Sequence, residues 1–170
     1  MGSLLFLSFH ANFICYTKHH QDGGIILMTT VKNVLNDKSN HAIFTIQPTD
    51  TVFSAIKLMA EKGIGAVIVT EKEKVVGIFS ERDYTRKIIL MERSSRTTNV
   101  NEIMTSNVIT VTTNMSIESC LNLMTDKHLR HLPVVENDKL LGLVSIGDLV
   151  KAAMDDQKKL IDQLQQYISG

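Results

Sequence analysis

The chain has 170 residues, of which 44% are hydrophobic and 5% aromatic, and its 18 basic residues balance 18 acidic ones. This length suffices for one compact domain or for two small units that share a core. A zero formal net charge and few aromatic rings argue against a nucleic-acid-binding surface, which needs a basic field and rings for base stacking. A local basic site for a small anion remains compatible with a neutral chain.

The chain contains two cysteines, Cys15 and Cys120, and they form no C-x-x-C pair. Two widely spaced cysteines make neither a disulfide framework nor a zinc site. Cys120 lies in an apolar helical pattern, so we expect it to be a small buried residue. His128 and His131 stand three apart, but no metal site is expected there. A reducing compartment fits this cysteine usage, which favours a cytoplasmic location, with an organelle matrix as the alternative.

Residues 1–27 differ in composition from the rest of the chain. The apolar run "MGSLLFLSFHANFICY" precedes the polar stretch "TKHHQDGG". No basic residue precedes the run, and His10 and Asn12 interrupt it, so neither a signal peptide nor a membrane span is favoured. We interpret residues 1–27 as a disordered or artefactual extension, with an apolar tail that docks on a partner as the alternative.

The next segment, residues 28–92, predicts the order β-α-β-β-α. A short strand in "AIFTI" leads to a helix in "PTDTVFSAIKLMAEKG", which Asp50 or Thr51 can cap and Gly63 can end. The strands "AVIVT" and "VVGIF" follow, joined by the charged turn "EKEK". Ser80 then opens a second helix, and the polar linker "ERSSRTTN" follows.

Residues 93–156 repeat this pattern. The strand "VITV", a helix capped by Ser116, the strands "LPVVE" and "LLGLV", and a helix opened by Ser145 follow in the same order. When Thr45–Ile88 is placed on Thr110–Ala153 without a gap, eleven of 44 pairs are identical, against about three expected by chance. The identical pairs are Thr45/Thr110, Ser54/Ser119, Leu58/Leu123, Met59/Met124, Lys62/Lys127, Val69/Val134, Glu71/Glu136, Lys74/Lys139, Gly77/Gly142, Ser80/Ser145 and Asp83/Asp148. Two copies indicate a pseudo-symmetric α+β pair rather than a solenoid.

The last helix outruns the repeat into residues 157–170. Its apolar positions form an amphipathic stripe. We expect part of this stripe to contact a second subunit, because symmetric dimers are the commonest oligomers, with packing inside its own domain as the alternative. The stripe consists of Leu149, Val150, Ala153, Met154, Leu160, Ile161, Leu164 and Ile168.

Each copy contains the pattern Gly-apolar-apolar-Ser-x-x-Asp, in "GIFSERDYTRK" from Gly77 and in "GLVSIGDLVKA" from Gly142. With "RHLPVV", "NEIMTSNVITV" and the gapless repeat, these phrases resemble a tandem pair of cystathionine-β-synthase-type (CBS) domains, also called a Bateman module. The phrases "SERDYTRKI", "RSSR" and "MTDKHLRHLPV" are similar to stand-alone CBS-pair proteins of bacteria and plant organelles. The resemblance covers about residues 28 to 156. It implies two β-α-β-β-α motifs packed sheet to sheet, no catalytic centre, and adenine nucleotides bound in clefts between the repeats of a homodimer.

The resemblance also implies roles for particular residues. The ribose ligands would be Ser80 and Asp83 in one cleft and Ser145 and Asp148 in the other, since a carboxylate can accept hydrogen bonds from a ribose diol. S-x-x-D is also the spacing of a helix capping box, so helix caps are the alternative, and the two roles are compatible.

The resemblance assigns phosphate contacts to Arg82, Arg130 and His131, whose alternative is solvated surface charge. The first copy has Gly65 and Ala66 where the second has Arg130 and His131. The two clefts are therefore expected to differ, with the Asp148 cleft as the better site.

The function hypothesis is a regulatory module that senses AMP, ATP, NAD or a similar ligand and signals to an unknown protein through a conformational or dimer-interface change. The adenosyl ligand would act as a regulator rather than an obligatory cofactor. The alternative is a purely structural dimerisation module with vestigial clefts. An enzyme is not expected, because the sequence has no nucleophile–base pair, P-loop or G-x-G-x-x-G motif.

Overall fold

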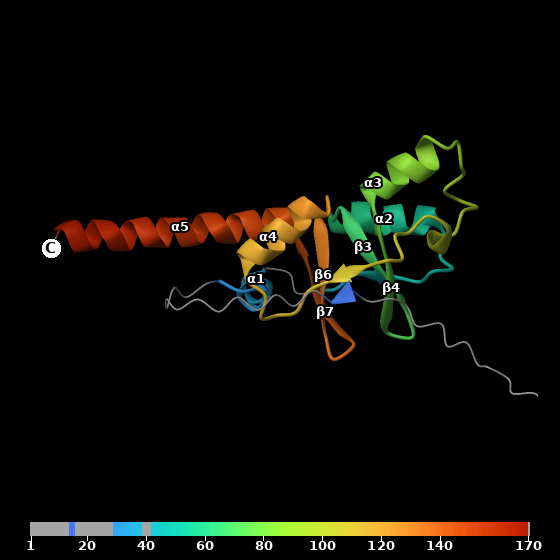
Figure 1. Cartoon of the computed structure of the whole chain (residues 1–170). Helices are drawn as coiled ribbons and strands as arrows, with labels where there is room; N and C mark the ends of the chain where they lie inside the picture. The colour runs from blue at the N-terminus through green and yellow to red at the C-terminus, as the bar shows by residue number, and fades with distance from the viewer. Residues whose placement is uncertain (1–13, 16–28, 39–41, 170) are drawn as a thin grey trace, which may run out of the picture.

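The computed structural model describes residues 14–15, 29–38 and 42–169 (Figure 1). The expectation of a loose extension over residues 1–27 therefore falls outside the described residues, except at Ile14–Cys15. These two residues form strand β1, which pairs in parallel with β5 (Ile109–Thr110). No described helix is both long enough and apolar enough to cross a membrane.

The predicted order of elements is confirmed in both repeats. In the first, α1 (Val31–Asp37) precedes β2 (Thr45–Ile46), α2 (Val52–Lys62), β3 (Ala66–Glu71), β4 (Lys74–Ser80), α3 (Glu81–Tyr84) and the π-helical segment η1 (Thr85–Ile89). In the second, the 3-10 segment η2 (Val100–Glu102) precedes β5, α4 (Ile117–Asp126), β6 (His131–Glu136), β7 (Lys139–Ser145) and α5 (Ile146–Ser169).

The helix caps show why these segments fold locally as predicted. Thr51 Oγ1 accepts a hydrogen bond from Ser54 N at 3.2 Å, and Ser116 Oγ accepts one from Ser119 N at 3.1 Å. Each satisfies a backbone donor that the first helical turn leaves open. Gly63 ends α2 with φ +62°, a left-handed conformation that glycine adopts without strain.

The two small sheets repeat the same topology and register. In the first sheet, β2 lies parallel to β3 and β3 antiparallel to β4. In the second, β6 and β7 are antiparallel, and a parallel bridge joins Val111 to Val134. This bridge is the pseudo-symmetric equivalent of the Ile46–Val69 pair in the first sheet. The duplication seen in the sequence is thus preserved in the strand pairing.

The cores, however, do not follow the boundaries 28–92 and 93–156. Val31 and Val34 of α1 are buried in the core of the second repeat, together with Leu149. Val100 and Ile103, which precede β5 in the second repeat, are buried in the core of the first. The helix α1, which precedes β2, therefore completes the core of the second repeat. The segment that precedes β5 completes the core of the first.

A third buried cluster lies between the two sheets and confirms their sheet-to-sheet packing. Its buried members are Ile68, Val75 and Val108, against which the partly buried Ile78, Val135, Leu140 and Leu143 pack. Beside it, α5 begins at the end of β7 and then extends away from the body of the molecule (Figure 1). Leu149 near its start is fully buried, whereas Leu164 and Ile168 near its end are 54% and 83% exposed.

Candidate functional site

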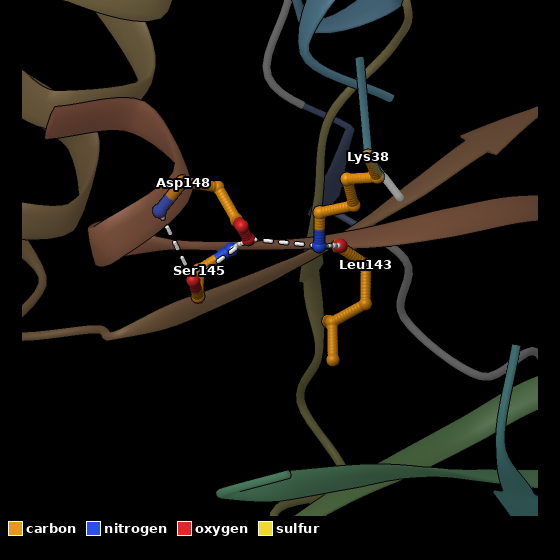
Figure 2. A network of polar contacts seen from close by, with 4 residues as sticks. All are labelled: Lys38, Leu143, Ser145 and Asp148. Atoms are coloured by element: carbon orange, nitrogen blue, oxygen red, sulfur yellow. Dashed lines mark hydrogen bonds and ion pairs between the residues drawn. The ribbon is translucent and has the colours of Figure 1, made fainter. Parts of the chain in front are cut away.

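Ser145 and Asp148 join the end of β7 to the first turn of α5. Asp148 Oδ2 accepts hydrogen bonds from Ser145 N and Ser145 Oγ, each at 2.7 Å, and Ser145 Oγ accepts one from Asp148 N at 3.2 Å (Figure 2). Ser80 and Asp83 make the same three contacts at the start of α3, at 3.1, 2.6 and 3.4 Å. The capping-box interpretation is therefore confirmed at both phrases.

The two aspartates differ in what binds their second oxygen. Asp83 Oδ1 forms an ion pair with Lys87 Nζ at 2.9 Å, so both of its oxygens are engaged. At Asp148, the ion pair comes from Lys38 Nζ at 2.8 Å and falls on Oδ2, the oxygen already bound by Ser145. Within the described part of the chain, Asp148 Oδ1 has no hydrogen-bond or ion-pair partner. It remains free to accept hydrogen bonds from a ligand.

Lys38 is the residue of this site that the sequence reasoning missed. It follows α1, and its Nζ also donates a hydrogen bond to the Leu143 carbonyl of β7 at 2.8 Å (Figure 2). A lysine so far from Asp148 in sequence carries no local signal. Only the packing of α1 on the second repeat brings it to the site.

A cleft of about 960 Å³ opens beside Asp148, between the two repeats. Its lining comes from α1, from residues 42–44 and 62–66, and from parts of β6, β7 and α5. Three of the residues predicted to bind a ligand line it together, namely Ser145, Asp148 and His131. Its apolar lining includes Ile43, Phe44, Ile64, Leu141 and Leu143, and its basic lining includes Lys32, Lys38, Lys62 and Lys151.

The remaining predicted residues lie outside the lining of this cleft. Ser80 and Asp83 belong to the opposite repeat. Arg82 is exposed, and its Nη1 donates to the His128 carbonyl at 3.3 Å. Arg130 is also exposed, and its carbonyl accepts a hydrogen bond from Ile146 N. Phosphate contacts by the two arginines therefore remain predictions.

The surroundings shift the pKa values of two groups in the cleft. Burial works to raise the pKa of Asp148, but hydrogen bonds from Lys38 and Ser145 outweigh it and leave the pKa below its ordinary value. Burial lowers the pKa of His131, and the charge of Arg130 lowers it further. At neutral pH the site therefore presents an ionised carboxylate and a neutral imidazole. His131 can take part in hydrogen bonding there without carrying a positive charge.

Neither metal nor thiol chemistry finds support in the described residues. They contain no group of three or more His, Cys, Asp or Glu side chains placed to hold a metal ion. Cys120 is a free cysteine, fully buried in the second core, as the sequence predicted. Burial raises the pKa of its thiol to about 12, so it remains protonated and unreactive.

The fold and site define a class: a pseudo-symmetric α+β pair with a cleft between its repeats. A sequence model of the CBS domain matches residues 31–90 and 100–155. A mitochondrial CBS domain-containing protein of Arabidopsis thaliana, CBSX3, is 38% identical over 150 residues, covering 84% of this chain and 73% of that protein.

Two solved structures are also similar to this chain. A CBS-domain protein from Burkholderia ambifaria MC40-6 is 51% identical, with a TM-score of 0.73 over 76% of this chain and 96% of that one. A hexameric CBS-CP12 protein from bloom-forming cyanobacteria is 26% identical, with a TM-score of 0.66 over 75% and 72% of the two chains. The chain belongs to the CBS-domain family and carries a tandem CBS pair. Paired CBS domains are generally regulatory modules that bind adenosyl ligands.

Proposed function

We propose that this chain is a regulatory module that binds an adenosyl ligand, such as AMP, ATP or NAD, in the cleft beside Ser145 and Asp148. The observation that carries the proposal is that Asp148 lines the cleft and that its Oδ1 has no partner among the described residues. Its partner oxygen is fixed by Ser145 and Lys38, so the carboxylate is held in place before a ligand arrives. A ribose hydroxyl could donate to Oδ1 without displacing any contact at Oδ2.

The rest of the cleft suits the other parts of such a ligand. Ile43 and Ile64 of the first repeat and Leu141 of β7 give apolar surface against which a purine ring could lie. The lysines of the lining provide donors for phosphate oxygens. The cleft thus combines an apolar surface with a few polar groups at its edge, as small-molecule sites usually do.

We propose that the first repeat offers the weaker site. Both oxygens of Asp83 are engaged, because Ser80 binds one and Lys87 the other. A ribose at Asp83 would compete with Lys87, which also donates to the Ile103 carbonyl at 2.6 Å. These contacts support the expectation from the sequence that the two clefts differ, with the Asp148 cleft as the better site.

A signal could leave the cleft through α5. Asp148 lies in the first turn of this helix, and the far half of the helix exposes an apolar stripe. A ligand that binds one orientation of the helix more tightly shifts the population toward that orientation. We propose that the stripe contacts a second copy of the chain, in line with the hexamer formed by the cyanobacterial relative. The protein that receives the signal is unknown, and no nucleic acid or membrane partner is proposed.

A structural dimerisation module with vestigial clefts is the second candidate, and the exposed stripe of α5 favours it. For the compartment, we keep the cytoplasm with an organelle matrix as the alternative. The mitochondrial relative supports that alternative.

Isothermal titration of the wild-type protein with AMP, ATP, NAD and S-adenosylmethionine tests the proposal, with GMP as the control for the base. We expect saturable binding of at least one adenosyl ligand, weaker binding of GMP, and recovery of the nucleotide unchanged. Absence of binding to all four ligands would leave only the structural candidate. Turnover of a nucleotide would contradict a purely regulatory role.

A further inference from the structure

Lys38 differs from the other three lysines of the cleft in being held by the fold. Its side chain is 27% exposed, and its Nζ is fixed at 2.8 Å from both Asp148 Oδ2 and the Leu143 carbonyl. Lys32, Lys62 and Lys151 are exposed. An ammonium group has three hydrogens to donate, and these contacts use two of them. The third remains available to an acceptor in the cleft.

The charges of the cleft are balanced, and Lys38 is part of that balance. Four lysines line it, Lys32, Lys38, Lys62 and Lys151, against four carboxylates, Asp37, Glu136, Asp148 and Asp155. His131 adds no charge at neutral pH, because burial lowers its pKa. Without Lys38, the lining would carry a net negative charge, with the unpaired carboxylate of Asp148 at the ribose position.

This placement matters for any ligand that carries charge on its ribose. A carboxylate that binds the ribose hydroxyls also repels a phosphate on the 5′ carbon of the same sugar, because the two groups lie only a ribose length apart and the cleft screens them less than bulk water does. A cation bound directly to that carboxylate removes the repulsion. Its free hydrogen can then attract the phosphate.

We propose that Lys38 makes the Asp148 cleft select adenosyl ligands with a negatively charged 5′ substituent over neutral or cationic ones. This inference rests on the proposed function, since it concerns the ligand of the same cleft. It assigns AMP-like ligands to the site and disfavours adenosine, whose 5′ hydroxyl is neutral. It equally disfavours S-adenosylmethionine, whose 5′ carbon bears a sulfonium.

The test is calorimetric titration of AMP, adenosine and S-adenosylmethionine into the wild type, Lys38→Met, Lys38→Arg and Lys74→Met. Lys74 is an exposed lysine at the start of β4, outside the lining of the cleft, and serves as the matched control. We expect Lys38→Met to weaken AMP binding by about tenfold or more, to change adenosine binding by less than about threefold, and not to weaken S-adenosylmethionine binding. Lys38→Arg keeps the charge and should keep the preference for AMP, and Lys74→Met should behave as the wild type.

Each outcome is distinct. Equal weakening of AMP and adenosine by Lys38→Met would show that Lys38 only supports the fold, and would overturn the inference. A wild type that binds AMP and adenosine alike would overturn it while the proposed function stands. A wild type that binds no adenosyl ligand would overturn both. If thermal melting shows that Lys38→Met is unfolded at the assay temperature, Lys38→Gln carries the same comparison.

Discussion

Asp83 and Asp148 occupy the same place in two copies of one phrase, yet their neighbours give them different capacities. A lysine binds each of them, but Lys87 takes the oxygen of Asp83 that Ser80 leaves open, whereas Lys38 shares the oxygen of Asp148 that Ser145 already holds. The free acceptor is therefore found on the second carboxylate. The identity of the two phrases does not make the two sites equivalent.

The Lys38–Asp148 ion pair should make stability depend on pH. Because hydrogen bonds from Lys38 and Ser145 hold the pKa of Asp148 below its ordinary value, the ionised carboxylate stabilises the fold above the pKa of the unfolded chain, about 3.9. That contribution disappears as the pH falls through the lower, folded-state pKa. We expect Lys38→Met to reduce the free energy of unfolding at pH 7 by about 1 kcal/mol or less, since the pair is partly exposed.

Urea denaturation of the wild type and Lys38→Met at several pH values measures this difference. It should shrink as the solution is acidified, because Asp148 becomes protonated in both proteins. A difference that stayed constant down to low pH would mean that Lys38 stabilises the fold only through its contact with Leu143 and its packing.

At the scale of elements, α1 is the one that does not pack on the repeat that follows it in the sequence. The helix packs on β7 of the second repeat, where Leu35 approaches Gly142 closely. A Cβ at residue 142 would lie 2.7 Å from Leu35 Cδ2, which is closer than real Cβ atoms come to a neighbour. A side chain at residue 142 would therefore require the end of the Leu35 side chain to move.

Gly142→Ala should therefore destabilise the fold by about 1 kcal/mol, the lower end of the cost of overpacking, because only the end of the Leu35 side chain has to move. Gly147→Ala is the matched control, because a Cβ there would lie 3.7 Å from Ser145 Oγ, an ordinary contact. In a Leu35→Ala background, the cost of Gly142→Ala should fall, as a double-mutant cycle in urea would show. Additive effects of the two substitutions would contradict the packing of α1 against β7.

Much of this architecture is predictable because it depends on local chemistry. The caps at Thr51 and Ser116, the left-handed Gly63 and the apolar strands on either side of each charged turn are all encoded within a few residues. The crossing of α1, and with it the placement of Lys38, depends on contacts between distant segments. No periodicity or motif near Lys38 indicates these long-range contacts.

In the site, too, the features set by local sequence are predictable and those set by long-range packing are not. The capping contacts of Ser145 and Asp148 follow from their spacing, and His131 does line the cleft. The side chains of Arg82 and Arg130 could not be placed from their positions in the motif, because the direction of an exposed side chain is set by its neighbours. Arg82 contacts the carbonyl of His128 in the opposite repeat.

At the scale of the whole molecule, the pseudo-symmetric body ends in an asymmetric projection. The first repeat closes with the short α3 and η1, whereas the second continues into the 24 residues of α5. The far half of α5 exposes Leu160, Ile161, Leu164 and Ile168 by 54–83%. An apolar stripe on a projecting helix is a surface that a second helix can cover.

Leu164→Glu should therefore convert a self-associated protein into a monomer, measured as mass by light scattering after gel filtration. The substituted side chain is exposed, so we expect the melting temperature of the body to change little. Gln166→Glu, two residues further and on another face of the helix, is the control. A wild type that is monomeric, or a Leu164→Glu variant that keeps the wild-type mass, would contradict self-association through this stripe.

The most direct test of the account compares the two equivalent aspartates by calorimetric titration with AMP. We expect Asp148→Ala to weaken the main binding event by about tenfold or more, because it removes the carboxylate proposed to bind the ribose, whose Oδ1 has no partner among the described residues. Asp83→Ala should leave that event within about threefold of the wild type. Loss of binding in Asp83→Ala with retention in Asp148→Ala, or unchanged binding in both, would contradict the assignment of the ligand to the Asp148 cleft.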